Sequence, residues 1–406
     1  MVLADIAVYV TDKISSEDIT IEEYVTTDSL LQNKRGRCEA QNLPPVACSL
    51  THFEEGDILV ANIRPYLKKV WLADSEGGCS ADVLVFRAKE GHSSEYLHAV
   101  LLQDAFFSYA MKGNKGSKMP RGDKDQIMRF PIQQVSPSDE PRIGNIIHSI
   151  NRKIQLNSEI NHYLEALAKQ LYDYWFVQFD FPDENGKPYK SSGGKMVWNE
   201  KLKREIPQGW SHGSLLDIAN YTNGLACQKF RPTNERKLPV IKIKEMHDGF
   251  SSETEYVTAD ISESVKVYDG DVLFSWSASL EVMLWACGNG GLNQHIFKVT
   301  SKNGYPKSFY YYQLLNYIAH FKRLAEARKT TMGHITQEHL QQSIIVLPPD
   351  LTIPNQLEVR ISPILEQIVL NNQEIIKLTR QRDELLPLLM NGQVSVTQLN
   401  NDLPVD

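Results

Sequence analysis

The sequence predicts an α/β protein built as a tandem repeat. Two mixed α/β units are each followed by one long helix, and the two helices are expected to pack antiparallel as a coiled coil with a pseudo-twofold axis. Two observations predict this fold class. A heptad pattern of apolar residues, typical of a long helix with one buried edge, occurs twice along the chain. A Gly-Asp-x-Leu motif in the segments before these helices recurs at the same spacing.

The first long helix is predicted over residues 141–181. About 36 helical residues at 1.5 Å each would form a rod of roughly 54 Å. Asn157 and Asn161 fall at positions where the pattern requires apolar residues. An Asn in such a seam favours one register, because only one alignment gives it a partner. The apolar seam itself consists of Ile143, Ile147, Ile150, Ile154, Leu164, Ala168, Leu171 and Trp175.

The second long helix is predicted over residues 354–392. A shift of 214 residues places Asn157 on Asn371, so the polar exception of the first seam recurs in the second. We therefore assign coiled-coil register to Asn157 and Asn371. The second seam consists of Leu357, Ile361, Ile364, Ile368, Asn371, Ile375, Leu378, Leu385 and Leu389.

Prolines affect the predicted bounds of the second helix. Pro363 predicts that the helix starts with Ser362 as its cap or is kinked there. Pro387 and Gly392 are expected to end it, and residues 393–406 form a polar tail.

The globular units are predicted over residues 1–140 and 210–353, joined by a linker and hairpin over residues 182–209 that is rich in Gly, Pro, Ser and charge. The Gly-Asp-x-Leu sequence of residues 56–59 recurs at residues 270–273. Each copy reads as a turn that enters a strand.

Composition is that of an ordinary globular protein. The 406 residues, 42% of them apolar, suggest two to three domains. No apolar run approaches the ~20 residues that span a bilayer. The N-terminal residues do not resemble a signal peptide, so a cytoplasmic protein is expected. The five cysteines form no C-x-x-C, which argues against a disulfide framework or a zinc site.

The helix sequence KIQLNSEINHYLEALAKQLYDYWFVQFDFP resembles the central conserved helix of specificity subunits from type I restriction-modification systems. The pattern GDILVANIRPYL…GGCSADVLVFRA is similar to their target recognition domains, and KGSKMPRGD followed by RFPI is similar to the end of such a domain. Pro363 and Pro387 depart from the family pattern. The resemblance covers nearly the whole chain.

This resemblance implies a non-catalytic subunit that binds double-stranded DNA. Each target recognition domain would read one half of a split sequence, and the helix pair would set the gap between the halves. The helices would also dock two methyltransferase subunits, which carry S-adenosylmethionine and methylate adenine. Motor-nuclease subunits would join to cut unmodified DNA. Differences between residues 63–68 and 277–282 predict unlike readers and an asymmetric target.

Several cationic or aromatic side chains are candidates for DNA contact. Arg can bind guanine through two hydrogen bonds, and cations spaced among glycines can neutralise phosphates. The alternatives are solvated loops, surface ion pairs and, for Trp276, a place in the core. The candidates are Arg64, Lys68, Lys69, Lys115, Lys118, Arg121, Lys229, Arg231, Trp276 and Lys329.

A second apolar stripe lies beside the seam of the first long helix. A helix with two stripes buries two faces. The second stripe can dock another chain, here a methyltransferase subunit, or can contact its own globular unit; both readings remain open. Its residues are Leu156, Ile160, Tyr163 and Leu167.

Motifs of catalysis are not found in the sequence. The [N/D]-P-P-[F/Y] loop of adenine methyltransferases, the G-x-G-x-x-G and P-loop phosphate motifs and H-E-x-x-H do not occur, so no cofactor, metal site or catalytic residue is predicted. The net charge of −7 favours a rival reading, a coiled-coil scaffold that does not touch DNA.

Overall fold

The computed structural model describes residues 1–112, 119–277, 279–327 and 334–393. Contacts divide the chain into two compact units, each of which contains part of both long helices. Unit 1 comprises Met1–Leu156 and Lys377–Asp406, and unit 2 comprises Asn157–Ile376. No helix in the described ranges is long and apolar enough to cross a membrane.

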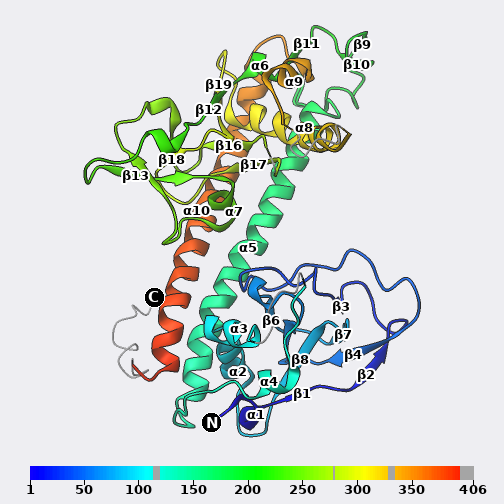
Figure 1. The fold of residues 1–406 in the computed structure, drawn as a ribbon. Helices are drawn as coiled ribbons and strands as arrows, with labels where there is room; N and C mark the ends of the chain where they lie inside the picture. Colours follow the sequence, from blue (N-terminus) through cyan, green and yellow to red (C-terminus); the bar gives the residue numbers. More distant parts are fainter. Residues whose placement is uncertain (113–118, 278, 328–333, 394–406) are drawn as a thin grey trace. The chain divides into compact units, whose positions relative to one another are not determined.

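Unit 1 contains two four-stranded sheets (Figure 1). The first, β1-β8-β5-β6, is antiparallel throughout, and the second, β2-β4-β7-β3, has β3 parallel to β7. The strands are β1 (Ala7–Tyr9), β2 (Lys13–Ser15), β3 (Tyr24–Val25), β4 (Ser49–Phe53), β5 (Ile58–Ala61), β6 (Val70–Leu72), β7 (Gly77–Cys79) and β8 (Val83–Ala88). The short helices are α1 (Leu3–Ile6), η1 (Pro65–Leu67), α2 (Ser94–Leu101), α3 (Asp104–Ala110) and α4 (Lys124–Met128).

Unit 2 also contains two four-stranded sheets, β12-β19-β16-β17 and β14-β13-β18-β15, and two strand pairs, β9–β10 and β11–β20. The strands are β9 (Met196–Asn199), β10 (Arg204–Pro207), β11 (Ser211–Ser214), β12 (Ala219–Asn223), β13 (Lys237–Ile241), β14 (Tyr256–Thr258), β15 (Lys266–Val267), β16 (Val272–Ser275), β17 (Glu281–Leu284), β18 (Gly290–Leu292), β19 (Ile296–Ser301) and β20 (Ile344–Leu347). The helices are α6 (Leu215–Ile218), η2 (Cys227–Lys229), α7 (Ile243–Asp248), η3 (Glu263–Val265), α8 (Lys307–Ala327) and α9 (Gln337–Gln342).

The two units repeat one topology. The strand order β1-β8-β5-β6 of unit 1 corresponds to β12-β19-β16-β17 of unit 2, and every pair in both sheets is antiparallel. In each unit the first strand of this sheet follows a short helix whose third residue, Asp5 or Asp217, accepts a 2.7 Å hydrogen bond from the backbone amide before the helix. The predicted tandem α/β repeat is confirmed.

The recurring Gly-Asp pair forms the turn into the central strand of each sheet. Gly56 has a φ of +88°, a conformation that favours glycine. Asp57 accepts hydrogen bonds of 2.7 and 2.8 Å from Arg87, and Asp271 forms a 2.8 Å ion pair with Lys298. Because the two cations lie on β8 and β19, the motif ties each turn to the neighbouring strand.

The first long helix, α5, occupies Glu140–Phe176, and the predicted interval was 141–181. The chain leaves helical geometry before Phe179, whose φ is +67°. Within unit 2, Asn157 contacts Glu374 and Asn161 contacts the carbonyl of Ile368 on the second long helix. Since the partner number falls as the α5 number rises, the helices run antiparallel there, as predicted.

The second long helix, α10, runs without a break over Thr352–Met390, so the predicted start at Ser362 is wrong. Pro363 removes one backbone donor and leaves the carbonyl of Val359 without its helical partner. Val359 is 76% exposed, so water can replace the missing donor. Pro387 is also exposed, and the helix continues beyond it.

Both long helices bury apolar residues against the sheets of each unit. In unit 1 the helices contribute Ile143, Ile147, Leu386, Leu389 and Met390 to the core. In unit 2 they contribute Ala168, Tyr172, Trp175, Phe176, Leu357, Ile361, Leu365 and Ile368.

Candidate nucleic-acid interface

The candidate site lies at one edge of the antiparallel sheet, where the central strand ends and its neighbour begins. In unit 1 the backbone amide of Asn62, directly after β5, donates a 2.8 Å hydrogen bond to the carbonyl of Asp82 before β8. In unit 2 the amide of Trp276, directly after β16, donates a 3.4 Å bond to the carbonyl of His295 before β19. The two units therefore present equivalent edges with different side chains.

Arg64 lies in the turn after β5 in unit 1. Its φ of 53° places it in the left-handed region, as does the φ of 52° at Lys68 on the other side of η1. Its backbone amide donates a 2.8 Å hydrogen bond to the carbonyl of Pro120. The Arg64 side chain is exposed, and its guanidinium pairs with no other residue in the described parts of the chain. Arg64 is thus free to bind an external acceptor.

Lys68 and Lys69 bind groups of their own unit. Lys68 Nζ lies 2.9 Å from Asp104 Oδ1, and Lys69 Nζ donates to the carbonyl of Thr27. Burial raises the pKa of Asp104, but hydrogen bonds from Lys34 and Lys68 outweigh it and leave that pKa below its usual value. The two predicted DNA cations therefore hold this turn in place. Sequence reasoning missed Lys34 and Asp104, because partners so distant in sequence carry no local signal.

Arg121 joins Arg64 at this edge. The segment containing Arg121 forms an isolated antiparallel bridge with Ile63, next to Arg64. Arg121 Nη2 lies 3.0 Å from Asp82 Oδ1, and the Arg121 side chain is 62% exposed. Its charge is therefore shared with an internal carboxylate. Lys115 and Lys118, also predicted to contact DNA, lie outside the described residues.

Trp276 occupies the equivalent edge of unit 2. Its indole Nε1 donates a 3.0 Å hydrogen bond to Asn223 Oδ1 at the end of β12. The rings of His295 and His334 lie 5.7 and 5.3 Å from the indole, and Phe297 packs against it from the core. Trp276 is half-buried, so it both anchors the edge and reaches the surface. The amide and the two imidazoles were not predicted from sequence.

Lys229 and Arg231 lie in the segment that follows β12. Both side chains are exposed. The segment is fixed to the same edge as Trp276, because Leu225 donates a 2.7 Å backbone bond to Leu292 and accepts a 2.9 Å bond from Gln294. These two cations can therefore flank whatever Trp276 contacts. The predicted DNA contact Lys329 lies outside the described residues.

The seam asparagines lie in the part of the helix pair that belongs to unit 2. Asn371 Nδ2 donates a 2.8 Å hydrogen bond to Asn161 Oδ1, whereas Asn157 Nδ2 donates a 2.7 Å bond to Glu374 Oε2. The predicted register residues Asn157 and Asn371 thus bond to other partners. Because the helices are antiparallel, Asn371 lies opposite a residue one turn beyond Asn157.

The second apolar stripe of α5 faces away from both cores. All four of its residues are exposed, and Tyr163 reaches 72%. None of them joins an apolar cluster among the described residues, so the stripe adds nothing to the cores of the globular units. The stripe consists of Leu156, Ile160, Tyr163 and Leu167.

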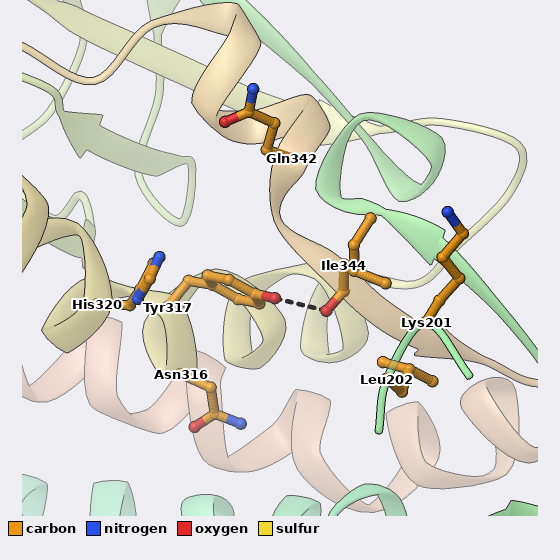
Figure 2. A pocket seen from close by; sticks show the side chains of 7 residues that line it. All are labelled: Lys201, Leu202, Asn316, Tyr317, His320, Gln342 and Ile344. Atoms are coloured by element: carbon orange, nitrogen blue, oxygen red, sulfur yellow. Dashed lines mark hydrogen bonds between the residues drawn. The ribbon is translucent and has the colours of Figure 1, made fainter. Parts of the chain in front are cut away.

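Unit 2 also contains a cavity of about 480 Å³ (Figure 2). Tyr317 spans it and donates a hydrogen bond to the carbonyl of Ile344, while the ring of His320 lies 5.9 Å from that of Tyr317. Figure 2 shows Asn316 and Gln342 at its walls, with Lys201 and Leu202 at the opposite side. No His, Cys, Asp or Glu cluster in the described ranges is arranged to hold a metal ion.

Residues 207–382 match the family model described as the type I restriction modification DNA specificity domain. The type I restriction enzyme MjaIX specificity subunit of Methanocaldococcus jannaschii is 24% identical over 87% of this chain and 81% of its own length. The HindI specificity subunit of Haemophilus influenzae is 22% identical over 91% and 94%, respectively. The structure of a type I restriction-modification S subunit from M. genitalium covers 96% of this chain and 95% of its own, at 12% identity and a TM-score of 0.57.

Two copies of one α/β unit, with unlike polar edges and a shared pair of long helices, define a two-part recognition protein. The chain carries the type I restriction modification DNA specificity domain over residues 207–382 and is similar over most of its length to specificity subunits of type I restriction-modification systems. Its function is DNA sequence specificity.

Proposed function

We propose that each unit reads one half of a split, asymmetric DNA sequence. The supporting observation is that the same sheet edge carries different chemistry in the two units. Unit 1 offers the free guanidinium of Arg64 beside Arg121, and unit 2 offers an indole, an amide and imidazoles around Trp276. Side chains that differ at equivalent positions select different bases, so the two half-sites differ.

The long helices dock two methyltransferase subunits in this proposal. The exposed stripe Leu156, Ile160, Tyr163 and Leu167 supports it, since an apolar helix face left uncovered in one chain is typical of a protein–protein interface. The methyltransferase subunits bring S-adenosylmethionine and adenine methylation, and motor-nuclease subunits bring cleavage. The specificity subunit is itself non-catalytic and acts on DNA in the cytoplasm.

Register of the helix pair is assigned to Asn157, Asn161 and Asn371. A change of register would shift one long helix along the other and alter the distance between the half-sites. The buried hydrogen bond from Asn371 to Asn161 supports this role, because a shifted alignment would break it and leave buried amide groups without partners.

The test is DNA binding by the full chain assembled with its methyltransferase subunits, measured at several salt concentrations. We expect affinity that falls steeply with salt, because cations such as Lys229 release counterions from phosphates. Lys229→Ala should reduce the slope of log K against log salt by about one unit. The exposed Lys203→Ala, in the linker, is the matched control. An assembled complex without measurable DNA affinity would favour a scaffold that never contacts DNA.

A further inference from the structure

Strained backbone in the chain gathers at one place in unit 1. Among the described residues, seven non-glycine residues have positive φ, and four of them are Asn33, Lys34, Arg64 and Lys68. These four form two turns that bond to each other: Asn33 donates 2.9 Å to the carbonyl of Leu67, and Lys34 donates 2.8 Å to that of Lys68. We call residues 33–34 and 64–68 the paired turns. Left-handed non-glycine residues are energetically unfavourable and concentrate at functional sites.

The buried side chain of Lys34 holds the paired turns in place. Its side chain is only 5% exposed, and its ammonium lies 2.8 Å from Asp104 Oδ1 and 3.2 Å from Asp383 Oδ1. Lys68, in the other turn, binds the same Asp104 oxygen at 2.9 Å. One carboxylate therefore joins the cations of both turns. A lysine this buried persists only where carboxylates neutralise it, so the arrangement is specific.

The network continues into both long helices within unit 1. Asp383 Oδ1 accepts a 2.9 Å hydrogen bond from Arg382 Nε, and Arg382 Nη1 donates a 3.0 Å bond to Asn151 Oδ1 on α5. Arg382 is 2% exposed. A rigid part of the unit thus holds the Asp383 carboxylate, and through Lys34 it holds the turns.

Unit 2 does not repeat this network. A shift of 214 residues places Arg382 on Ala168 and Asn151 on Leu365, and both of those residues lie in the apolar core of unit 2. The charged network is consequently a property of the first unit and its edge. If the network served only to stabilise the repeated fold, it would be expected in both units.

We propose that Lys34 is the positioning residue of the first recognition unit, and that Arg64 is the residue it positions, to bind a guanine of the first half-site. This inference rests on the proposed function. Arg binds guanine O6 and N7 through two parallel bonds, which require a fixed guanidinium direction. The paired turns supply that direction before DNA arrives, so less conformational freedom is lost on binding.

The experiment uses the full chain assembled with its methyltransferase subunits. One probe is a duplex that contains the sequence methylated by this complex. The other probes are derivatives of that duplex in which one G·C pair of either half-site is replaced by A·T. Arg64→Ala should reduce discrimination at one G·C pair of the first half-site by about 10-fold or more. Lys34→Met should reduce discrimination at that same pair, and Lys34→Arg should retain most of it. Lys13→Met, at an exposed lysine of unit 1, is the control and should change nothing.

Each result has a defined meaning. Loss at the same base pair in Arg64→Ala and Lys34→Met, with the second half-site unaffected, supports the proposal. Unchanged discrimination in either variant, or equal loss at both half-sites, overturns it. If Lys34→Met does not fold, Asp104→Asn repeats the test at an exposed carboxylate. A parent complex that shows no split-site preference would instead refute the proposed function itself.

Discussion

Asn371 donates a 2.8 Å hydrogen bond to Asn161 across the helix pair in unit 2, and each of these residues is only 6% exposed. Asn161 in turn donates to Asn372 Oδ1 at 2.8 Å and to the carbonyl of Ile368 at 3.3 Å. Three bonds converge on one amide, and a shift of either helix by one turn would break them. Polar residues in an otherwise apolar seam therefore define the alignment.

The first prediction concerns this amide pair. Asn371→Leu should lower the free energy of unfolding by about 1–3 kcal/mol, because the buried Asn161 oxygen loses its donor. The double variant Asn161→Leu/Asn371→Leu should recover the loss, since two apolar residues suit a seam, while permitting other registers. Denaturant unfolding measures stability, and cysteine cross-linking between the helices measures register.

Asn145→Leu, at an exposed position of α5, is the control and should stay within about 0.5 kcal/mol of the parent. A double variant that keeps a single cross-linking register would show that other seam residues set the alignment.

The second prediction concerns the buried guanidinium of Arg382. Arg382→Met should destabilise unit 1 by about 3–5 kcal/mol, because Asn151 and Asp383 lose a charged donor inside the unit. Arg380→Met is the matched control two residues away, where solvent screens an exposed ion pair with Glu384 and little stability is lost. Chemical denaturation compares the two. Equal effects would mean that the Arg382 network is no more stabilising than a surface pair.

The third prediction concerns pH. Burial, assisted by the charges of His148 and Arg382, lowers the pKa of His98 from 6.5 to about 3. Below pH 6.5 the unfolded chain binds a proton that the folded unit does not, so stability falls as the pH falls. The loss should reach about 2 kcal/mol as the pH drops from about 7 to about 5.

His98→Gln should flatten this part of the stability curve, and the exposed His320→Gln should leave it unchanged. Denaturant midpoints measured across the pH range make the comparison. If His98→Gln and the parent lose stability in parallel, another group carries the pH dependence.

The fourth prediction concerns the exposed stripe of α5. Ile160→Ala with Tyr163→Ala should weaken co-purification of the methyltransferase subunits by about 30-fold or more, as expected where apolar anchors are removed from an interface. The melting temperature should hardly change, since both side chains are exposed. Val46→Ala, at an exposed apolar residue of unit 1, is the control. Undiminished co-purification would place the docking surface elsewhere.

Local chemistry explains which features the sequence could predict. The Gly-Asp turn at Gly56 and Asp57 repeats because each residue has a local task, a positive φ and a bond to the next strand. The heptad periodicity of the two long helices could likewise be predicted from the sequence. The predicted helix start near Pro363 was wrong, because the exposed face of α10 can bond water in place of the missing backbone donor.

Pairing between distant residues was beyond sequence reasoning. Lys68 and Lys69 were predicted to contact DNA, with surface ion pairs as the alternative, but the sequence did not indicate their partners, Asp104 and the carbonyl of Thr27. The pairing of Asn371 with Asn161 depends on helix alignment, which a seam pattern leaves open by one turn. The residue types at a site can thus be predicted from the sequence more readily than the residues they contact.

The central claim is that two unlike edges read two unlike half-sites. Mapping adenine methylation in cells that express the chain with its methyltransferase subunits tests it most directly. We predict a motif of two specified runs separated by unspecified bases, in which Arg64→Ala relaxes only one run and Trp276→Ala relaxes only the other. A continuous or palindromic motif, or variants that relax both runs together, would contradict the account.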